Sequence, residues 1–363
     1  MPLEELIRSK TAELGFERFG ITSAEPIPEN EERFQKWLAG GYQGQMDYMA
    51  KEPSRRQDPR EVLPGAKSII VVAMNYNPVS PSPQPPPIKG GGNSLATLKI
   101  PSPLWGEGRG EGVTLTGRIA RYAWGRDYHK VLDKKLKQLE NYLHEIALGP
   151  IQSKRYVDTG PVLEKAYAER AGIGFIGKNT LLISKGLGSW LFLGEILTTL
   201  ELKKVPAFFL LQDESGKKEA GTFLGSCGTC TRCLDACPTD AFIAPYQLDA
   251  RKCIAYLTIE HRGPIPEELH EKMGDWIFGC DICQEVCPYN RKAPVTKELS
   301  FLPSPSMGEG RGGGGRLSLD NVLSIQSDEE YLKRFQGTPL MRAKRAGLQR
   351  NAAIAAGNQG LVQ

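Results

Sequence analysis

Cysteine spacing decides how this chain can be interpreted. The pattern C-x2-C-x2-C-x3-C-P is formed by Cys227, Cys230, Cys233, Cys237 and Pro238. Bacterial ferredoxins hold [4Fe-4S] clusters with this spacing, because a loop with a ligand at every third residue directs three sulfurs at one cluster. The fourth ligand then comes from elsewhere in the chain. The pattern therefore predicts a domain that transfers single electrons.

A second cysteine run repeats this pattern in part. Cys280, Cys283, Cys287 and Pro288 have the same spacing, but Ile277 stands where the first cysteine belongs. In two-cluster ferredoxins the cysteine before each proline binds the other cluster. We therefore predict that cluster one is bound by Cys227, Cys230, Cys233 and Cys287, and cluster two by Cys253, Cys280, Cys283 and Cys237. These two sets account for all eight cysteines of the chain.

Zinc and disulfides are the alternatives for these cysteines. C-x2-C pairs also suit tetrahedral zinc, but zinc sites rarely need the triplet with its trailing proline. Disulfides fit less well, because the N-terminus does not resemble a signal peptide and free thiols indicate a reducing compartment. We therefore expect a cytoplasmic iron–sulfur protein.

Length and composition allow a soluble protein of several domains. The 363 residues suffice for two or three domains with buried cores. No apolar stretch approaches the ~20 residues of a membrane-spanning helix, so we expect no membrane association. The net charge of +4 is compatible with a nucleic-acid partner but is too small to argue for one.

The region before the cysteines predicts a sheet domain. Residues 68–74 form a short β-branched run that is apolar on both faces, which is typical of a central buried strand, and residues 190–200 and 207–211 are similar. Apolar residues at three- and four-residue intervals predict a helix over 127–146, and a second helix is expected over 162–171. Strands interleaved with helices favour an α/β (or α+β) fold class. We assign this domain to residues 1–215, the cluster domain to 216–298 and a C-terminal helical region to 299–363.

Two segments rich in proline, glycine and serine interrupt this organisation. They are Pro78–Thr116 and Pro303–Arg316, and both contain the sequences PSP and GEGRG. Such composition buries too little apolar surface to offset the entropy of ordering. We interpret both as flexible insertions, with ligand-binding loops as the alternative.

The C-terminal residues 327–363 are expected to be helical and to change sign along their length. The acidic residues Asp328 to Glu330 come first, as suits a helix N-terminus. Six cations follow without an acidic residue among them: Lys333, Arg334, Arg342, Lys344, Arg345 and Arg350. Such a run usually forms a solvated face, and the alternative is that it follows a phosphate backbone.

Three segments of the first domain are candidates for a reaction site. No G-x-G-x-x-G motif follows a predicted strand and no P-loop is present, so a nucleotide site is not indicated. The candidates are residues 121–129, 157–161 and 172–179, which combine charged or aromatic side chains with glycine. Taken alone, Asp127 is also a suitable helix N-cap, and Asp158 is able to satisfy loop amides. His129 has no second histidine at helical spacing, which favours a packing role over that of a metal ligand.

A family resemblance adds a function to these patterns. The segments RYAWGRDYH, VDTGPVLEKAYAERAGIGFIGKN, CGTCTRCLDACPTDAF, CDICQEVCPYN and LQRNAAIAAGN resemble, in this order, the epoxyqueuosine reductases. The resemblance covers nearly the whole chain apart from the two insertions. It implies a cobalamin-binding domain similar to that of reductive dehalogenases, then a ferredoxin-like domain with two [4Fe-4S] clusters, then HEAT-like helices.

The resemblance also implies a reaction and its partners. Epoxyqueuosine at the wobble position of tRNA with a GUN anticodon would lose its epoxide oxygen as water, giving queuosine in the last step of its biosynthesis. Two electrons would come from an external low-potential donor through the clusters and cobalamin. We expect a monomer. The competing hypotheses are a reductive dehalogenase and an electron carrier without catalysis.

The resemblance places roles on particular residues. Asp158 would donate the proton, while Arg121, Asp127 and Asn179 would lie with it at the cofactor. The motif D-x-H-x-x-G is absent, which fits a cobalamin without a protein histidine on cobalt. A helix start beside Asp158 would lower its pKa, so we expect burial at the cofactor to raise it again. His261 and Arg262 are expected near the tRNA or the corrin.

Overall fold

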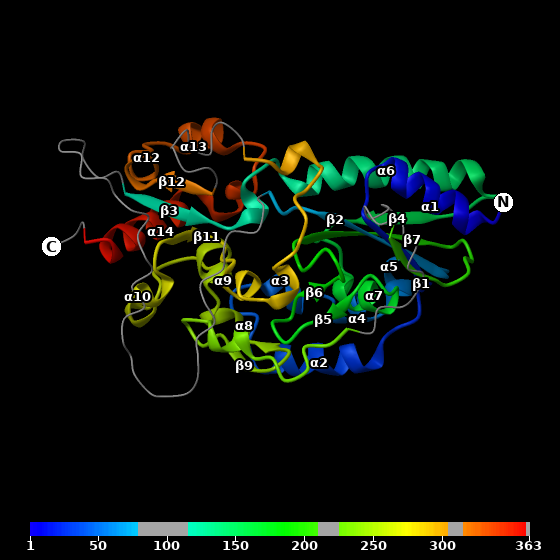
Figure 1. Ribbon diagram of the computed structural model, residues 1–363, viewed down its shortest axis with the longest axis horizontal. Coiled ribbons are helices and arrows are strands. Elements are labelled where there is room, and N and C mark those ends of the chain that lie inside the picture. The colour runs from blue at the N-terminus through cyan, green and yellow to red at the C-terminus, as the bar shows by residue number, and fades with distance from the viewer. Residues whose placement is uncertain (79–114, 210–224, 304–314, 361–363) are drawn as a thin grey trace.

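A five-stranded antiparallel sheet organises the N-terminal half of the computed structural model, which describes residues 1–78, 115–209, 225–303 and 315–360 (Figure 1). The order of its strands is β4-β7-β2-β1-β8. Their bounds are β1 Arg18–Ser23, β2 Ser68–Asn75, β4 Ser153–Tyr156, β7 Leu191–Thr198 and β8 Val205–Phe209. Of the three buried runs predicted from the sequence, 68–74 and 190–200 correspond to the neighbouring strands β2 and β7, and 207–211 overlaps β8.

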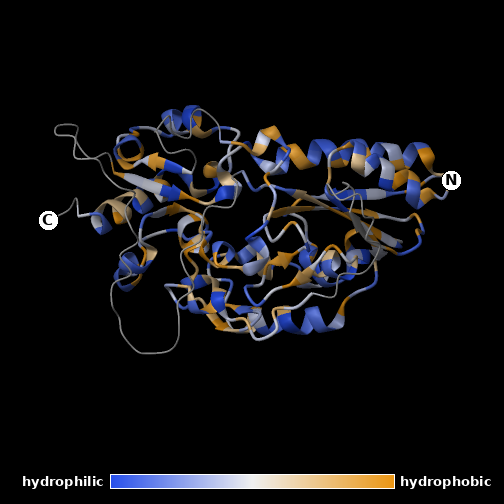
Figure 2. Cartoon of the chain, in the orientation of Figure 1, coloured by the Kyte–Doolittle hydropathy of each residue, from blue (hydrophilic) through white to orange (hydrophobic). Residues whose placement is uncertain are grey.

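Helices cover both faces of this sheet. Helices α1 (Leu3–Glu13) and α6 (Tyr128–Ile146) pack on the face that carries Ile70 and Val72, whereas α7 (Glu164–Arg170) packs on the face that carries Val71. Every residue of β2 is buried, and Figure 2 shows the strands of the sheet as largely apolar and α6 as striped. The central position predicted for this strand is therefore confirmed.

The direction of the strands decides between the two predicted fold classes. All four pairings of the sheet are antiparallel, so this half has an α+β architecture. A strand covered by helices on both faces is a continuous apolar run whether its neighbours are parallel or antiparallel. The sequence pattern therefore does not distinguish the two cases.

Short elements complete this half and bring its loops to one side of the sheet. They are α2 Pro28–Ala39, α3 Asp47–Ala50, α4 Pro53–Gln57, α5 Pro59–Val62, η1 Arg121–Ala123, and the hairpin strands β5 Phe175–Ile176 and β6 Leu182–Ile183. The predicted helix over 162–171 begins at Glu164, two residues later than expected.

The cysteines lie in a region of short helices and loops. Its elements are α8 Arg232–Asp235, β9 Phe242–Ala244, β10 Gln247–Leu248, η2 Ala250–Lys252, α9 Ile254–Ile259, η3 Glu267–Leu269, α10 His270–Met273, β11 Trp276–Phe278, α11 Ile282–Glu285, η4 Pro288–Asn290 and η5 Leu299–Phe301. Helices α8 and α11 each carry the third ligand position of a cysteine motif and pack against each other. This contact brings the two motifs together.

A small second sheet ties the C-terminal region to both earlier parts of the chain. Strand β3 (Thr116–Ile119) pairs in parallel with β11 and antiparallel with β12 (Arg316–Ser318). The helices that pack around it are α12 Leu319–Leu323, α13 Asp328–Phe335, η7 Pro339–Ala343 and α14 Lys344–Asn358. A strand from our predicted first domain thus shares a sheet with the other two. The helical prediction for 327–363 is confirmed over the described residues, while a HEAT-like character stays a prediction.

The predicted insertions fall mostly outside the described residues. Residues 79–114 and 304–314 are not described, and neither are 210–224, which contain the predicted boundary at 215. The two insertion ranges were drawn slightly too long, because Thr116 and Arg316 are strand residues joined by a hydrogen bond from Nε to Oγ1 of 2.8 Å. Within the described ranges, no helix combines the length and the apolar character needed to cross a membrane.

Candidate functional site

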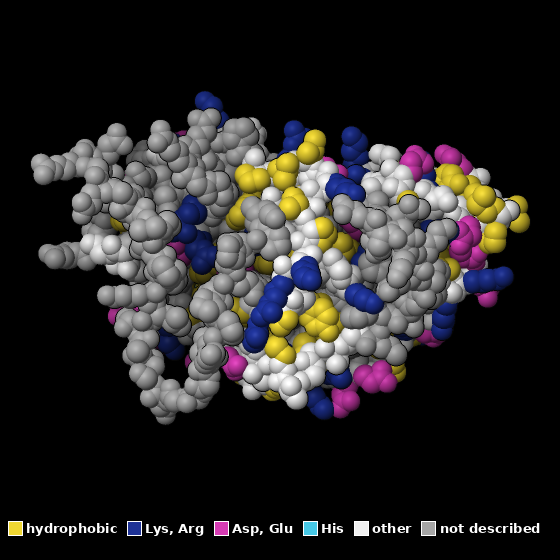
Figure 3. Space-filling model, in the orientation of Figure 1, with side chains coloured by type: hydrophobic (Ala, Val, Ile, Leu, Met, Phe, Trp, Pro, Cys, Tyr) yellow, Lys and Arg dark blue, Asp and Glu magenta, His cyan; other side chains and the backbone are white. Residues whose placement is uncertain are grey.

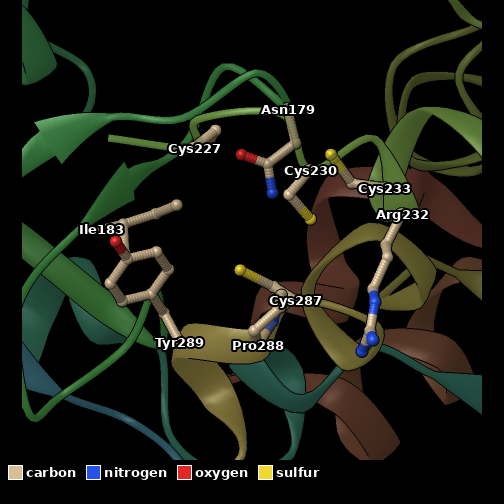
Figure 4. A pocket seen from close by; sticks show the side chains of 9 residues that line it. All are labelled: Asn179, Ile183, Cys227, Cys230, Arg232, Cys233, Cys287, Pro288 and Tyr289. Atoms are coloured by element: carbon tan, nitrogen blue, oxygen red, sulfur yellow. The ribbon is translucent and has the colours of Figure 1, made fainter. Parts of the chain in front are cut away.

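Four cysteines converge on a small cavity at the first cysteine motif. The cavity measures about 40 Å³ and is lined by Cys227, Cys230, Cys233 and Cys287, together with Asn179, Ile183, Arg232, Pro288 and Tyr289 (Figure 4). The first three cysteines come from the loop before α8 and from α8 itself, whereas Cys287 follows α11. The structure therefore brings together the four residues that the sequence assigns to cluster one.

The remaining cysteines form a second, partly buried group. Burial raises the pKa of the Cys253, Cys280 and Cys283 thiols, and the charges of neighbouring cysteines raise it further. Cys237 acts in this way on both Cys253 and Cys280. These contacts are those expected of the predicted second set. Thiolates held so close together need a cationic centre between them, which iron supplies.

The geometry favours clusters over single zinc ions. In the part of the chain that the structure describes, no three histidine, cysteine or carboxylate side chains converge as ligands of one ion. Zinc thiolate sites place each sulfur about 2.3 Å from the metal. Here the four sulfurs of the first set surround a cavity instead, which suits a cubane of four irons.

A second, much larger cavity lies where the three parts of the chain meet. Its volume is about 1170 Å³, which exceeds the roughly 300–1,000 Å³ of ordinary small-molecule sites. Its walls include the first turn of α6, the loop before α7, α9 and η7. Cys253, a predicted ligand of cluster two, also lines it. The predicted ligand set of cluster two therefore reaches the wall of this cavity.

Two aspartates, a histidine and a tyrosine form one group on the cavity wall. Asp127 caps α6 by accepting a hydrogen bond from the backbone N–H of His129, as the N-cap interpretation predicts. The His129 ring then bridges two carboxylates, with Nδ1 2.8 Å from Asp127 Oδ1 and Nε2 3.4 Å from Asp158 Oδ2. The Tyr128 hydroxyl donates to Asp158 Oδ2 at 2.7 Å. Its ring stacks on Phe192 of β7, which fixes its position.

This arrangement keeps a positive charge on His129. Burial alone lowers its pKa, but the hydrogen bonds and charges of Asp127 and Asp158 outweigh burial and raise the pKa to about 9. His129 therefore does more than pack, although its ring also stacks on Tyr128. Tertiary contact with Asp158, 29 residues further along the chain, supplies the partner that helical spacing lacked.

The surroundings of Asp158 lower its pKa, whereas we expected burial to raise it. Although 60% of its side chain is open to the cavity, nearby protein atoms still desolvate the carboxyl, which raises its pKa. Hydrogen bonds from His129 and Tyr128 outweigh this and lower the pKa below its ordinary value. The expected helix start is also absent at this position, because Asp158 lies in a turn with φ of 59° and α7 begins at Glu164. At neutral pH the proton of this group is therefore held by His129.

Two of the predicted cofactor residues lie elsewhere. The Arg121 guanidinium stacks 4.4 Å from the Trp190 ring centre, and its backbone N–H donates to Asp281 Oδ2 at 2.8 Å. Asn179 lines the cluster-one cavity, and its Nδ2 donates to the Cys283 carbonyl at 3.5 Å. Both residues thus brace the cysteine loops, and neither lines the large cavity.

Sequence reasoning missed several residues of the large cavity. Tyr128 and Glu164 lay inside quoted segments but received no role, and the wall also includes Arg33, Arg56 and Arg342. The signal for the first two was their place beside Asp127 and Asp158. Arg33 and Arg56 carry no local signal, because they come from separate helices, whereas Arg342 was one of the cations singled out near the C-terminus.

Comparisons with known proteins show the family of this chain. A curated epoxyqueuosine reductase of Pseudomonas aeruginosa is 40% identical over 360 residues, which cover 98% of this chain and 85% of that protein. The chain belongs to the epoxyqueuosine reductase family. The reductase of Gloeobacter violaceus is also 40% identical, over 99% of this chain and 97% of its own, and that of Escherichia coli is 36% identical, over 98% and 81%.

Two family models match parts of the chain, and solved reductase structures match nearly all of it. The model described as "Epoxyqueuosine reductase QueG, DUF1730" matches residues 56–159, and "4Fe-4S double cluster binding domain" matches 226–290, which include all eight cysteines. The reductase of Streptococcus thermophilus superposes with a TM-score of 0.78 at 30% identity, over 99% of this chain and 82% of that one. A reductase crystallised with an epoxyqueuosine-modified tRNA stem loop gives 0.77 at 30% identity, over 98% and 81%. The predicted double-cluster domain is thereby confirmed.

Proposed function

We propose that this reductase converts epoxyqueuosine to queuosine at the wobble position of tRNA with a GUN anticodon, using cobalamin bound in the large cavity. The proposal rests on two groups that line the same cavity. Cys253 of the predicted second cluster and the Asp158–His129 pair line the same cavity, so an electron source and a proton source face one space. The two cysteine motifs lie next to each other, because α8 packs on α11, so electrons would pass between the two clusters before they reach this cavity.

The residues of the large cavity fit cobalamin. Its volume exceeds that of ordinary ligand sites, as a corrin with its side chains requires. Apolar walls suit the faces of the ring, and they are formed by Met46, Tyr122, Val162, Leu163, Ile176 and Met341. His129, which lies on this wall, is held between two carboxylates and is not free to bind cobalt. This agrees with the missing D-x-H-x-x-G motif. Bound cobalamin would supply a low-potential cobalt centre that delivers electrons to the epoxide.

The protein side chains supply protons to the departing oxygen. Removing the epoxide oxygen as water consumes two electrons and two protons and leaves a carbon–carbon double bond. An acid within hydrogen-bond reach is needed, because the opened epoxide is an alkoxide. We assign proton delivery to Asp158 and its resupply to His129, since the imidazolium Nε2 lies 3.4 Å from the carboxylate. Asp127 orients the ring through Nδ1.

The C-terminal cations contribute less to tRNA binding than their number suggests. Four of the six are engaged within the protein: Arg334 pairs with Glu330, Arg342 with Glu260 and Arg345 with Asp328, while Arg350 donates to backbone carbonyls. Figure 3 instead shows basic side chains around an apolar area in the middle of one face. Arg33, which is exposed, and Arg56 lie on the cavity wall. We propose that the tRNA binds across this cavity, where its phosphates meet such cations.

The test is turnover of epoxyqueuosine-containing tRNA by anaerobically reconstituted protein. We expect Asp158→Asn to abolish turnover while the corrin absorbance still shifts on binding, because the amide fills the site but donates no transferable proton. Asp133→Asn is the matched control, since Asp133 pairs with Arg155 on the surface of α6. Retained turnover in the first variant would remove Asp158 from the reaction.

Two further measurements separate the competing functions. Gel retardation of the tRNA should weaken steeply with salt, because phosphate contacts release counterions. Unchanged corrin bands on mixing would exclude cobalamin and favour a plain electron carrier, and turnover of halogenated compounds without tRNA affinity would favour a dehalogenase. We also propose that the protein acts as a cytoplasmic monomer supplied by an external low-potential donor.

A further inference from the structure

A glutamate lies in the middle of the apolar strand β7. Glu195 is 0% exposed, and it faces the same side of the sheet as its cross-strand neighbours Val71 and Tyr156. The residues packed on this side form one of the hydrophobic clusters of the molecule, which includes Val71, Val162 and Leu197. An ionised carboxylate is costly in such surroundings unless it is paired. Packing alone therefore does not explain this residue.

A second carboxyl lies next to Glu195. Within the described residues, neither carboxylate oxygen of Glu195 has a donor to bind. Glu164, in the first turn of α7, comes within hydrogen-bond reach of it. Two carboxylates only accept hydrogen bonds, whereas a protonated carboxyl donates one. One proton between the two residues is therefore what satisfies both.

Glu164 also binds the loop that carries the proposed proton donor. Its Oε1 accepts a hydrogen bond of 2.5 Å from the backbone N–H of Asp158. Asp158 has a left-handed backbone with φ of 59°, which a residue other than glycine adopts only when its surroundings hold it there. Glu164 lines the large cavity and so connects the buried Glu195 to the reaction site.

We propose that Glu164 and Glu195 keep a proton between them at neutral pH, and that this carboxyl pair holds the Asp158 loop in the conformation that presents its carboxyl to the cavity. Both are positioning residues, and the proposal rests on the proposed role of Asp158. The shared proton makes Glu195 a donor to Glu164, which fixes the Glu164 carboxyl beneath the Asp158 amide.

The charges around the pair agree with a proton retained at neutral pH. Burial, and then the charge of Asp158, raise the pKa of Glu164 to about 8, and burial together with Glu164 raises that of Glu195 well above its ordinary value. Lys165 acts in the opposite direction on Glu164, and the phenol of Tyr156 faces Glu195 from β4. An acid with a raised pKa is neutral below that pKa, and burial together with Glu164 holds the pKa of Glu195 well above its ordinary value, so the pair loses its last proton only at alkaline pH, above about 8. Two buried carboxylates then repel, and the loop is released.

Two substitutions separate a shared proton from simple packing. Glu195→Gln keeps a donor toward Glu164 but has no titratable proton. We expect it to retain activity at pH 7 within about a factor of two of the unmodified protein, because the hydrogen bond is preserved. Its activity should not decline above pH 8, whereas that of the unmodified protein should. Glu195→Leu removes the donor, and we expect a loss of about a hundredfold at every pH, as for a displaced catalytic group.

The matched control is Glu201→Gln, because Glu201 is an exposed glutamate just beyond β7 that pairs with Lys67. It should leave both rate and pH profile unchanged. Near-normal rates in Glu195→Leu, or an alkaline decline that persists in Glu195→Gln, would overturn the proposal.

Hydrogen exchange at the Asp158 amide tests the same proposal without the substrate. We expect faster exchange of the peptide over 157–163 in Glu195→Leu and in the unmodified protein above pH 8, after correction for the intrinsic pH dependence of exchange, but not in Glu195→Gln. Peptides from α6 show whether each variant is folded. If the unmodified protein is inactive on epoxyqueuosine tRNA but shows this exchange pattern, the proposed function is rejected and the carboxyl pair is retained. Equal exchange in all variants would reject the role of the carboxyl pair.

Discussion

Replacing His129 with glutamine tests whether a charged imidazole links the two aspartates. The ring lies 2.8 Å from Asp127 and 3.4 Å from Asp158, and these carboxylates raise its pKa to about 9 although burial lowers it. Glutamine keeps much of the size and one hydrogen bond but carries no charge. The variant therefore removes the cation that compensates both carboxylates.

The size of the effect follows from the shift in pKa. A rise from the ordinary value near 6.5 to about 9 corresponds to about 3 kcal/mol of stabilisation. Solvent screens part of this, because the His129 side chain is 34% exposed, and about 2 kcal/mol is a suitable expectation. Since the pKa is raised in the folded protein, this stabilisation is complete below pH 6.5 and disappears as the pH rises through about 9.

The assay is the thermal unfolding midpoint of cluster-loaded protein at pH 6 and at pH 9.5. We expect His129→Gln to unfold roughly 4 °C below the unmodified protein at pH 6 and within about 1 °C of it at pH 9.5. His144→Gln is the control for loss of a histidine, because His144 is exposed and its Nε2 lies 2.9 Å from the hydroxyl of Ser153 and not between two carboxylates. A difference that stays constant with pH would refute a charged His129.

Three further predictions address the clusters, the interface between the two halves and the first insertion. Cys253→Ala should lower the iron content from about eight to about four per chain, because only cluster two loses a ligand, and iron analysis with electron paramagnetic resonance measures this. Gly188→Ala should lower the unfolding free energy by about 3 kcal/mol, because φ is +71° and the new Cβ would lie 2.0 Å from Asn290 Oδ1; Gly149→Ala, with no neighbour within 4 Å, is the control in thermal unfolding. Replacing residues 80–113 by a short glycine–serine linker should leave turnover and the corrin spectrum intact, and lost cobalamin binding would show that these residues are not a passive insertion.

The cysteine motifs show what the local sequence pattern is able to predict by itself. Spacing alone predicts a double-cluster domain, and the family model over residues 226–290 confirms it. Apolar runs likewise locate β2 and β7, and the helical period locates α6. These features depend on residues within about ten positions of one another. Periodicity and ligand spacing therefore determine them before the chain folds.

The proton-bearing group was decided only by the tertiary structure. Asp158 was expected to have a raised pKa, but His129 and Tyr128 lower it, and both come from a different segment of the chain. Glu195 reads in sequence as one polar residue in an apolar strand, and its partner Glu164 stands on a helix across the sheet face. Strand direction was equally undetermined, since burial on both faces gives the same pattern in either orientation. Electrostatics depends on distance in space, and a linear pattern records only distance along the chain.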